Sequence, residues 1–121
     1  MVPNGLSRKS RLHLQKDFQR VFTGGLKLKS DALVLWTVHN SHQQDVRFAV
    51  VVSRKLGTAV VRNRTKRLLR EAFRQLKQHI VAGTDVIVRP QDSEKLSNVQ
   101  AAQDALTTLC GKAAILKSPS L

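Results

Sequence analysis

The sequence has little of several residue types, and each shortage excludes a class of protein. It contains one cysteine, which rules out a disulfide within the chain, and no Cys/His spacing suited to zinc. No apolar run approaches the ~20 residues of a membrane-spanning helix, and the first residues lack the apolar segment of a secretory signal. These shortages favour a protein of the reducing cytoplasm that has no membrane partner.

The usual motifs of nucleotide-binding and hydrolytic enzymes are missing as well. There is no Walker loop and no GxGxxG, and one thiol with four scattered histidines gives no obvious nucleophile and base pair. Cys110 fits a buried helix residue better than a catalytic one. We therefore assign no catalytic residue, and we expect no metal or cofactor to be bound by the protein alone.

Acidic residues are scarce beside basic ones. The 121 residues include 21 Lys and Arg but 8 Asp and Glu, which gives a formal net charge of +13. Such an excess is typical of proteins that bind a polyanion, and charge alone leaves DNA, RNA and anionic membranes as candidates. With 41% hydrophobic residues, residues 1–121 are expected to form a single domain with one modest core.

Residues 60–77, VVRNRTKRLLREAFRQLK, separate charge from apolar residues when they are placed on a helix. At 100° per residue, cations fill one arc of roughly 140° and apolar residues fill the opposite side. A solvated face usually mixes charges of both signs, whereas Glu71 is the only acid in this run. One face is predicted to pack on a core and the other to bind phosphates. The cations of the arc are Arg62, Lys66, Arg67, Arg70, Arg74 and Lys77.

Other periodicities predict the elements around this basic helix. Residues 14–22 carry an apolar stripe at helical spacing, and two glycines follow it. Residues 31–39 alternate as a half-buried strand does, and residues 46–53 are almost continuously apolar, which favours a central strand. We expect these two segments to form an antiparallel hairpin. Residues 84–89 are predicted to be a short strand that pairs parallel to the strand before the basic helix.

The end of the chain completes an α+β fold. The basic helix is expected to end near Ala82 and Gly83, and a capping box at residues 97–100 begins a last helix that carries an apolar stripe. The expected architecture is a two-layer sandwich of helices and one sheet in the order αβββαβα. Residues 1–13 are expected to be a flexible basic arm, and residues 112–121 a flexible tail.

Residues 62–74, RNRTKRLLREAFR, preceded by SRKLGTAV at residues 53–60, resemble the signature helix of the bacterial ribonuclease P protein subunit. DFQRVF at residues 17–22 is also similar to that family, and the order of elements matches. The resemblance covers roughly residues 11–110. Trp36 stands where the family often has Tyr, which keeps an aromatic face but changes its size.

The resemblance implies a function and a topology that the residue pattern does not. Ribonuclease P removes the 5′ leader from precursor tRNA, its RNA subunit is the catalyst, and Mg²⁺ is held by RNA and substrate. This chain is then expected to be the accessory subunit, monomeric by itself, with the catalytic RNA and the precursor leader as partners. The family fold also implies that a left-handed crossover through the basic helix joins the parallel strands, against the usual right-handed rule.

Two groups of site residues follow from the resemblance. The first faces the catalytic RNA, and arginine suits this task because its planar fork donates two hydrogen bonds to one phosphate. The second holds the single-stranded leader in a cleft between the first helix and the sheet, where bases stack on aromatic rings. The RNA-facing residues are Arg62, Asn63, Arg64, Lys66, Arg67, Arg70 and Arg74, and the leader-binding residues are Arg11, Phe18, Phe22, Trp36, Arg54 and Lys55.

Alternatives remain open for several of these residues and for the function. Phe18, Phe22 and Trp36 can instead belong to the core, and Asn63 can instead tie the helix entry to the preceding loop. A structural ribosomal protein and a DNA-binding module are the rival functions. The basic helix has few short polar side chains that read base edges, which disfavours DNA. A ribosomal scaffold protein needs no open channel for a single RNA strand, so an aromatic cleft would distinguish a ribonuclease P subunit from a ribosomal protein.

Overall fold

A computed structural model of the chain describes residues 15–117, in which four strands form one mixed sheet in the order β1-β2-β4-β3. β2 pairs antiparallel with both β1 and β4, whereas β3 pairs parallel with β4. The strands are β1 (Leu26–Lys29), β2 (Leu33–His39), β3 (Arg47–Val50) and β4 (Thr84–Pro90). The helices are α1 (Gln15–Gly24), α2 (Ala59–Leu76) and α3 (Val99–Lys112), with short 3₁₀-helices η2 (Arg54–Leu56), η3 (Lys77–His79) and η4 (Ser93–Leu96).

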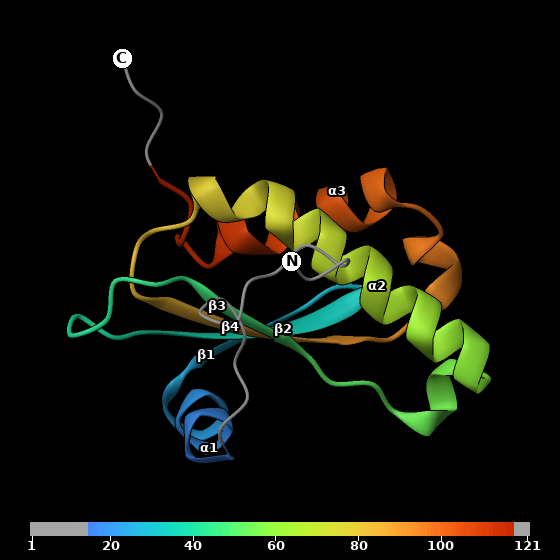
Figure 1. The fold of residues 1–121 in the computed structure, drawn as a ribbon, viewed down its shortest axis with the longest axis horizontal. Helices are drawn as coiled ribbons and strands as arrows, with labels where there is room; N and C mark the ends of the chain where they lie inside the picture. Colours follow the sequence, from blue (N-terminus) through green and yellow to red (C-terminus); the bar gives the residue numbers. More distant parts are fainter. Residues whose placement is uncertain (1–14, 118–121) are drawn as a thin grey trace, which may run out of the picture.

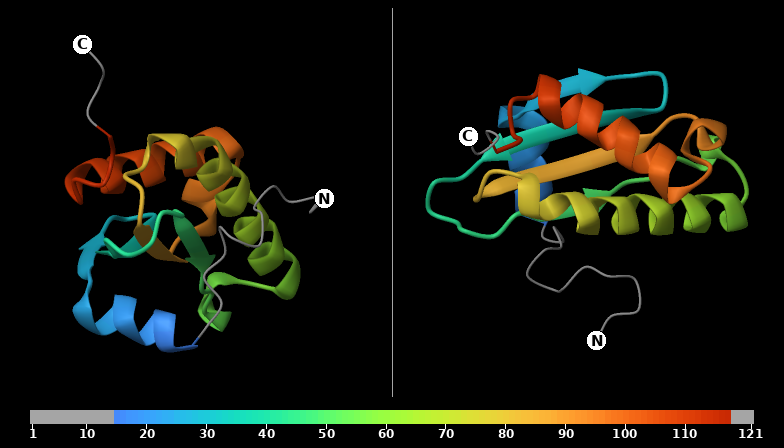
Figure 2. Two further views of the ribbon diagram at one scale, coloured as in Figure 1. Left: turned by 60° about the vertical axis from the view of Figure 1, so that its left-hand side comes forward. Right: turned by 90° about the horizontal axis from the view of Figure 1, so that it is seen from above.

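Helices cover both faces of the sheet. α2 and α3 lie side by side on one face, and α1 lies on the other (Figures 1 and 2). The α+β class and the order αβββαβα are confirmed, and the two-layer description applies to the sheet with α2 and α3. α1 adds a helix on the opposite face, so the sheet has two apolar surfaces to bury.

The larger part of the core lies between the sheet and the α2–α3 layer. Phe48 of β3 stacks on Phe73 of α2, with ring centroids 4.0 Å apart and an interplanar angle of 10°. On the other face a smaller cluster gathers Val21 of α1 with Val34 and Trp36 of β2. The period of two in β2 therefore sends alternate side chains into two separate cores.

The hairpin expected between residues 31–39 and 46–53 is wrong. β4 lies between β2 and β3, and β3 is at the edge of the sheet, not at its centre. The apolar run of β3 has another cause, since Phe48 faces α2 while Ala49 belongs to the cluster beneath α1. The parallel β3–β4 pair with α2 between its strands is confirmed. The left-handed sense expected for this crossover connection stays a prediction.

The expected end of the basic helix is also wrong. α2 ends at Leu76, η3 follows, and Ile80 is a buried extended residue that forms a bridge with Leu116. Gly83 has φ +83°, and a Cβ there would lie 2.6 Å from the Asn40 carbonyl oxygen. The glycine signal therefore marks the tight turn into β4 instead of the helix end.

Part of the expected flexible tail is packed. Ile115 is buried, its carbonyl accepts from the Val81 N–H at 2.8 Å, and the Lys117 N–H donates to the His79 carbonyl at 2.7 Å. These bonds tie residues 113–117 to the segment after η3, which the sequence pattern gave no reason to expect. The arm at residues 1–13 and the last four residues of the tail lie outside the described residues.

Candidate nucleic-acid interface

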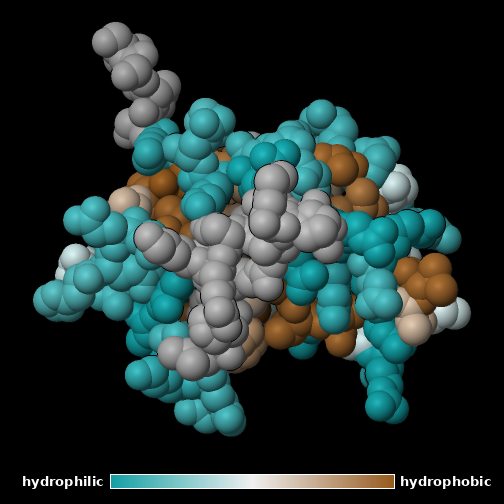
Figure 3. Space-filling model, viewed as in Figure 1, coloured by the Kyte–Doolittle hydropathy of each residue, from teal (hydrophilic) through white to brown (hydrophobic). Residues whose placement is uncertain are grey.

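The outer face of α2 carries the first candidate surface. Thr58 caps the helix, because its hydroxyl accepts from the Val61 N–H at 3.3 Å. Thr65, Leu69, Ala72 and Phe73 are the buried residues of this helix, so the sheet side is apolar as predicted. The surface in the view of Figure 3 is mostly hydrophilic around α2, with small separate apolar areas. The exposed candidates are Asn63, Arg64, Arg67 and Arg74, and the half-buried ones are Arg62, Lys66 and Arg70.

Arg62 has a structural contact besides any contact with RNA. One guanidinium nitrogen donates to the Gly57 carbonyl at 2.9 Å and joins α2 to the loop that follows η2. Arg62, and not Asn63, therefore ties the helix entry to the loop before it. Its remaining N–H groups keep the fork geometry that suits a phosphate.

Arg74 is engaged by a carboxylate on its own helix. Its Nε and a terminal nitrogen donate to Glu71 at 3.1 and 2.5 Å, and Gln75 donates to the same carboxylate at 2.8 Å. The hydrogen bond from Arg74, followed by that from Gln75, lowers the pKa of Glu71. Arg74 is therefore paired with an acid on its own helix, whereas Arg64 and Arg67 form no ion pair among the described residues.

On the opposite face of the sheet, three aromatic leader candidates come together between α1 and β2. The Phe22 ring meets the Trp36 ring edge to face with centroids 5.0 Å apart, and the Phe18 and Phe22 centroids are 6.3 Å apart. Trp36 is 8% exposed and Phe18 is half-buried, whereas Phe22 is 40% exposed. Trp36 is thus mainly a core residue, and Phe22 presents the open aromatic surface of this cluster.

Two cations that the sequence pattern did not single out border this aromatic cluster. Lys27 Nζ lies 5.6 Å from the Trp36 ring centroid, and the Arg89 guanidinium carbon lies 5.4 Å from it. Both distances are within the range of cation–π interactions. The strand register explains the arrangement. Lys27 of β1 is opposite Trp36 of β2, and Arg89 of β4 is opposite Val34, which lies two residues before Trp36 on β2. The alternation of side chains along a strand predicts which face of the sheet each cation lies on. Only the pairing of β1 and β4 with β2 shows that both cations lie over Trp36.

The remaining leader candidates lie on η2 or outside the described residues. Arg54 and Lys55 are exposed on η2, where the Ser53 hydroxyl accepts from the Lys55 N–H at 3.0 Å. Lys55 and Arg89 line the same cleft, of about 380 Å³, between η2 and the end of β4. Arg11 falls outside the described residues, so its role stays a prediction.

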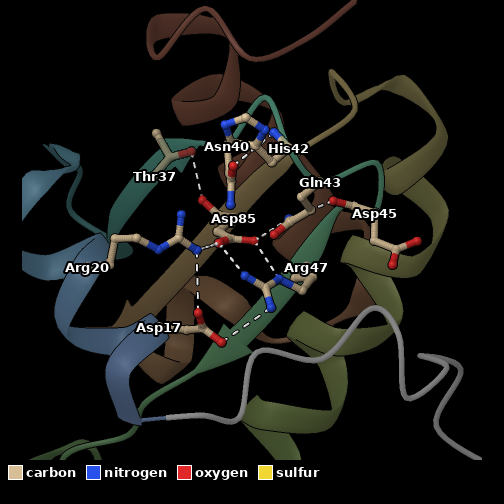
Figure 4. A network of polar contacts seen from close by, with 9 residues as sticks. All are labelled: Asp17, Arg20, Thr37, Asn40, His42, Gln43, Asp45, Arg47 and Asp85. Carbon is tan, nitrogen blue, oxygen red and sulfur yellow. Dashed lines mark hydrogen bonds and ion pairs between the residues drawn. The ribbon is translucent and has the colours of Figure 1, made fainter.

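A buried ionic network holds α1 on the sheet (Figure 4). Asp85 of β4 is fully buried and accepts from Arg47 twice at 2.8 Å, from Arg20 at 2.5 Å and from Gln43 at 2.8 Å. Asp17 of α1 lies 3.3 Å from Arg47 and 3.5 Å from Arg20, which closes the network. Because α1 carries Phe18 and Phe22, this network sets their position over Trp36.

The same network explains the ionisation of its members. Burial by itself would raise the pKa of Asp85, but hydrogen bonds from Arg47 and Gln43 and the charges of Arg47 and Arg20 outweigh it and lower that pKa. The hydrogen bond to Asp85 is the main cause that raises the pKa of Arg47. The buried carboxylate is therefore ionised at neutral pH and fully paired.

Other parts of residues 15–117 carry no comparable chemistry. Cys110 is fully buried on α3 as predicted, and burial raises the pKa of its thiol to about 12. Within the described residues, no three His, Cys, Asp or Glu side chains are grouped so that they could hold a metal ion. No helix among these residues is long and apolar enough to cross a membrane.

Comparison with known proteins decides the family. The family model named Ribonuclease P matches residues 6–114 of this chain. The chain belongs to the ribonuclease P protein family. It is 32% identical over 115 residues to the ribonuclease P protein component of Bacillus velezensis, and the match covers 95% of this chain and 98% of that protein.

Solved structures of ribonuclease P proteins have the same fold. A Staphylococcus aureus RNase P protein mutant with defective mRNA degradation activity is similar with a TM-score of 0.78 and 31% identity, over 88% of this chain and 90% of that one. The Thermotoga maritima RNase P protein has a TM-score of 0.72 and 33% identity, over 84% of this chain and 96% of that one. The ribonuclease P family fold therefore extends over nearly the whole described chain.

Proposed function

We propose that this chain is the protein subunit of a ribonuclease P holoenzyme and assists the removal of the 5′ leader from precursor tRNA. One observation carries the proposal beyond family membership. The aromatic cluster of Phe18, Phe22 and Trp36 is bordered by Lys27 and Arg89, on the sheet face opposite α2. Single-stranded RNA binds where bases can stack and phosphates can meet cations, and this surface offers both.

The outer face of α2 is proposed to bind the catalytic RNA. Arg64 and Arg67 are its best contacts, because both side chains are exposed and neither is paired with an acid among the described residues. Arg62, Asn63, Lys66 and Arg70 belong to the same surface. The two RNA surfaces lie on opposite sides of the sheet, so one small protein is able to join catalytic RNA and substrate leader.

The proposed contribution to the reaction is differential binding. A leader exists in precursor tRNA but not in the mature product, so a protein that grips the leader favours substrate over product. The net charge of +13 also offsets repulsion between RNA phosphates, which lowers the Mg²⁺ concentration that the particle needs. Cleavage is assigned to the RNA subunit with Mg²⁺ held by RNA and substrate, in the cytoplasm, and the protein alone is expected to be monomeric.

The rival function, a structural ribosomal protein, is supported by basicity alone. Membership of the ribonuclease P family favours leader recognition, and so does the exposed Phe22, whose ring contacts a tryptophan that two cations border. A ribosomal scaffold protein would bind precursor and mature tRNA without discrimination.

Phe22→Leu tests the leader assignment directly. The change keeps an apolar side chain but removes the ring, so precursor binding by the holoenzyme should lose ~1 to 3 kcal/mol while mature tRNA binding stays unchanged. Gel-shift titration with the cognate catalytic RNA measures both affinities. Leu26→Ala is the matched control, because Leu26 is 50% exposed and alternates to the other face of β1 from Lys27.

Leader length provides the second half of the test. With a leader of a single nucleotide, Phe22→Leu and wild type should bind precursor equally, because no base remains to stack. Equal loss of precursor and mature tRNA binding would instead assign Phe22 to the core and contradict the proposal.

A further inference from the structure

A groove of about 950 Å³ lies where α2 ends, between α3 and the loop before β3. Its volume is within the range of ligand pockets. Acids and cations both line it, Asp104 and Lys117 among them, so the groove has no single sign of charge. Such a lining suits an uncharged ligand that forms hydrogen bonds better than a run of phosphates. Five glutamines from three parts of the chain supply uncharged amides: Gln44, Gln75, Gln78, Gln100 and Gln103.

A chain of hydrogen bonds holds one of these amides in place. Gln103 of α3 donates to the side-chain carbonyl oxygen of Gln75 on α2 at 2.5 Å, and Gln75 donates to Glu71 at 2.8 Å. Gln103 uses one of its two amide N–H groups in this chain, and its own side-chain oxygen accepts no hydrogen bond within residues 15–117. Gln103 is therefore a positioned amide that keeps an acceptor and a donor for a ligand in the groove.

An amide of this kind matches the edge of adenine. Adenine offers an N6 amino group that donates beside an N7 atom that accepts, and a glutamine amide pairs with both. In an unpaired nucleotide this edge is open, and sequence-specific recognition of RNA mostly uses such unpaired bases. The groove also has surfaces for the flat faces of a base, since His79 brings an imidazole ring and Leu76 and Ile80 bring apolar side chains.

We propose that this groove binds one unpaired adenine, whose N6 and N7 atoms form hydrogen bonds with the Gln103 amide. Arg74 belongs both to the groove and to the outer face of α2, so an RNA bound on that face can place an extruded nucleotide in the groove. For this RNA source the inference rests on the proposed function, and it adds recognition of a base to a surface argued so far from charge. A free adenine nucleotide offers the same base, and the experiment separates the two sources.

Replacement of adenine N7 in the catalytic RNA tests the RNA source. Catalytic RNAs that carry 7-deazaadenosine at random adenine positions are selected for assembly with the protein, and the positions that weaken assembly are mapped. With wild type, one unpaired adenine should show an effect of about two- to tenfold, as expected for one hydrogen bond. With Gln103→Leu that effect should vanish, because the N–H that N7 would accept from is gone. Effects at other positions should persist, which shows that the variant assembles in the same way.

Gln19→Leu is the matched control. Gln19 is an exposed glutamine of α1, on the opposite face of the sheet from the groove, so the effect of 7-deazaadenosine should be the same as with wild type.

Calorimetric titration of the protein alone with AMP and with CMP tests the second source. Binding of AMP that is stronger than that of CMP and that Gln103→Leu removes, without a Gln103-dependent position in the RNA, would assign the groove to a free adenine nucleotide. A Gln103-dependent position in the RNA assigns it to the catalytic RNA.

Two results would overturn the adenine site. One is that neither a 7-deazaadenosine position nor AMP binding responds to Gln103→Leu, and the other is that AMP and CMP bind equally while no position in the RNA responds. Failure of the proposed function looks different, because wild type would then not assemble with the catalytic RNA. If wild type assembles and Arg67→Ala weakens assembly while nothing responds to Gln103→Leu, only the adenine site is wrong.

Discussion

Replacement of Asp85 by Asn should release α1 from the sheet. The change keeps the size of the side chain but removes the charge that Arg20 and Arg47 share. Loss of one partner from a buried ion pair costs ~3 to 5 kcal/mol when the other charge is left alone. Here Asp17 remains near both arginines, and the Arg47 and Arg20 side chains are 19% and 35% exposed. We therefore expect a loss of ~2 to 3 kcal/mol in the free energy of unfolding.

The pH dependence of this loss has a definite sign. The pKa of Asp85 is lower in the folded protein than the ordinary value of ~3.9 expected in the unfolded chain. Its ion pairs therefore contribute their full stability above about pH 4, and that contribution disappears as pH falls through the lower folded pKa. The difference in stability between wild type and Asp85→Asn should be constant near neutral pH and should shrink below about pH 4.

Urea unfolding followed by circular dichroism measures the difference at each pH. Asp45→Asn is the matched control, because Asp45 is an exposed acid on the neighbouring loop and makes no ion pair among the described residues. The Asp85→Asn variant should also lose discrimination between precursor and mature tRNA, since α1 carries Phe18 and Phe22. Neutral-pH stability within ~0.5 kcal/mol of wild type would refute the account of Asp85 as the residue that fixes α1.

Further expectations concern the RNA face, the buried thiol and the isolated protein. Arg67→Ala should weaken assembly with the catalytic RNA without changing the melting temperature. Arg62→Ala should weaken assembly too, and it should also lose ~0.5 to 1.5 kcal/mol of stability because its hydrogen bond to Gly57 is removed. Gel shifts measure assembly and thermal melts measure stability, and identical behaviour of the two variants would contradict this expectation. Cys110 should resist a thiol reagent at mildly alkaline pH until urea unfolds the protein, because burial raises the pKa of its thiol to about 12. Rapid labelling of the native protein would disprove the burial of this thiol. Without RNA, the protein should leave precursor tRNA uncut at the mature 5′ end. Cleavage of the precursor at that end by the protein alone would overturn the assignment of catalysis to RNA.

Local sequence signals predicted the beginning of α2, its apolar face and its cationic face. An amphipathic repeat with one acid among its cations predicts a helix with an apolar face, and Leu69 and Ala72 are indeed fully buried. The start of α3 is another local signal, but the predicted capping box is displaced by one residue, because Asn98 and not Ser97 is the N-cap and its side chain accepts from the Ala101 N–H at 2.8 Å. Periodicity and caps depend on neighbours within a few residues, so a sequence is sufficient to find them.

Only the tertiary structure decided which strands are neighbours and which side chains meet. β4 inserts between β2 and β3, which places Arg89 beside Trp36 and Asp85 beside Arg47. These pairs join residues on different strands, and strand alternation specifies a face without specifying a partner. The cationic face of α2 is therefore local, whereas the aromatic and cationic surface proposed to bind the leader exists only because the sheet order brings its parts together.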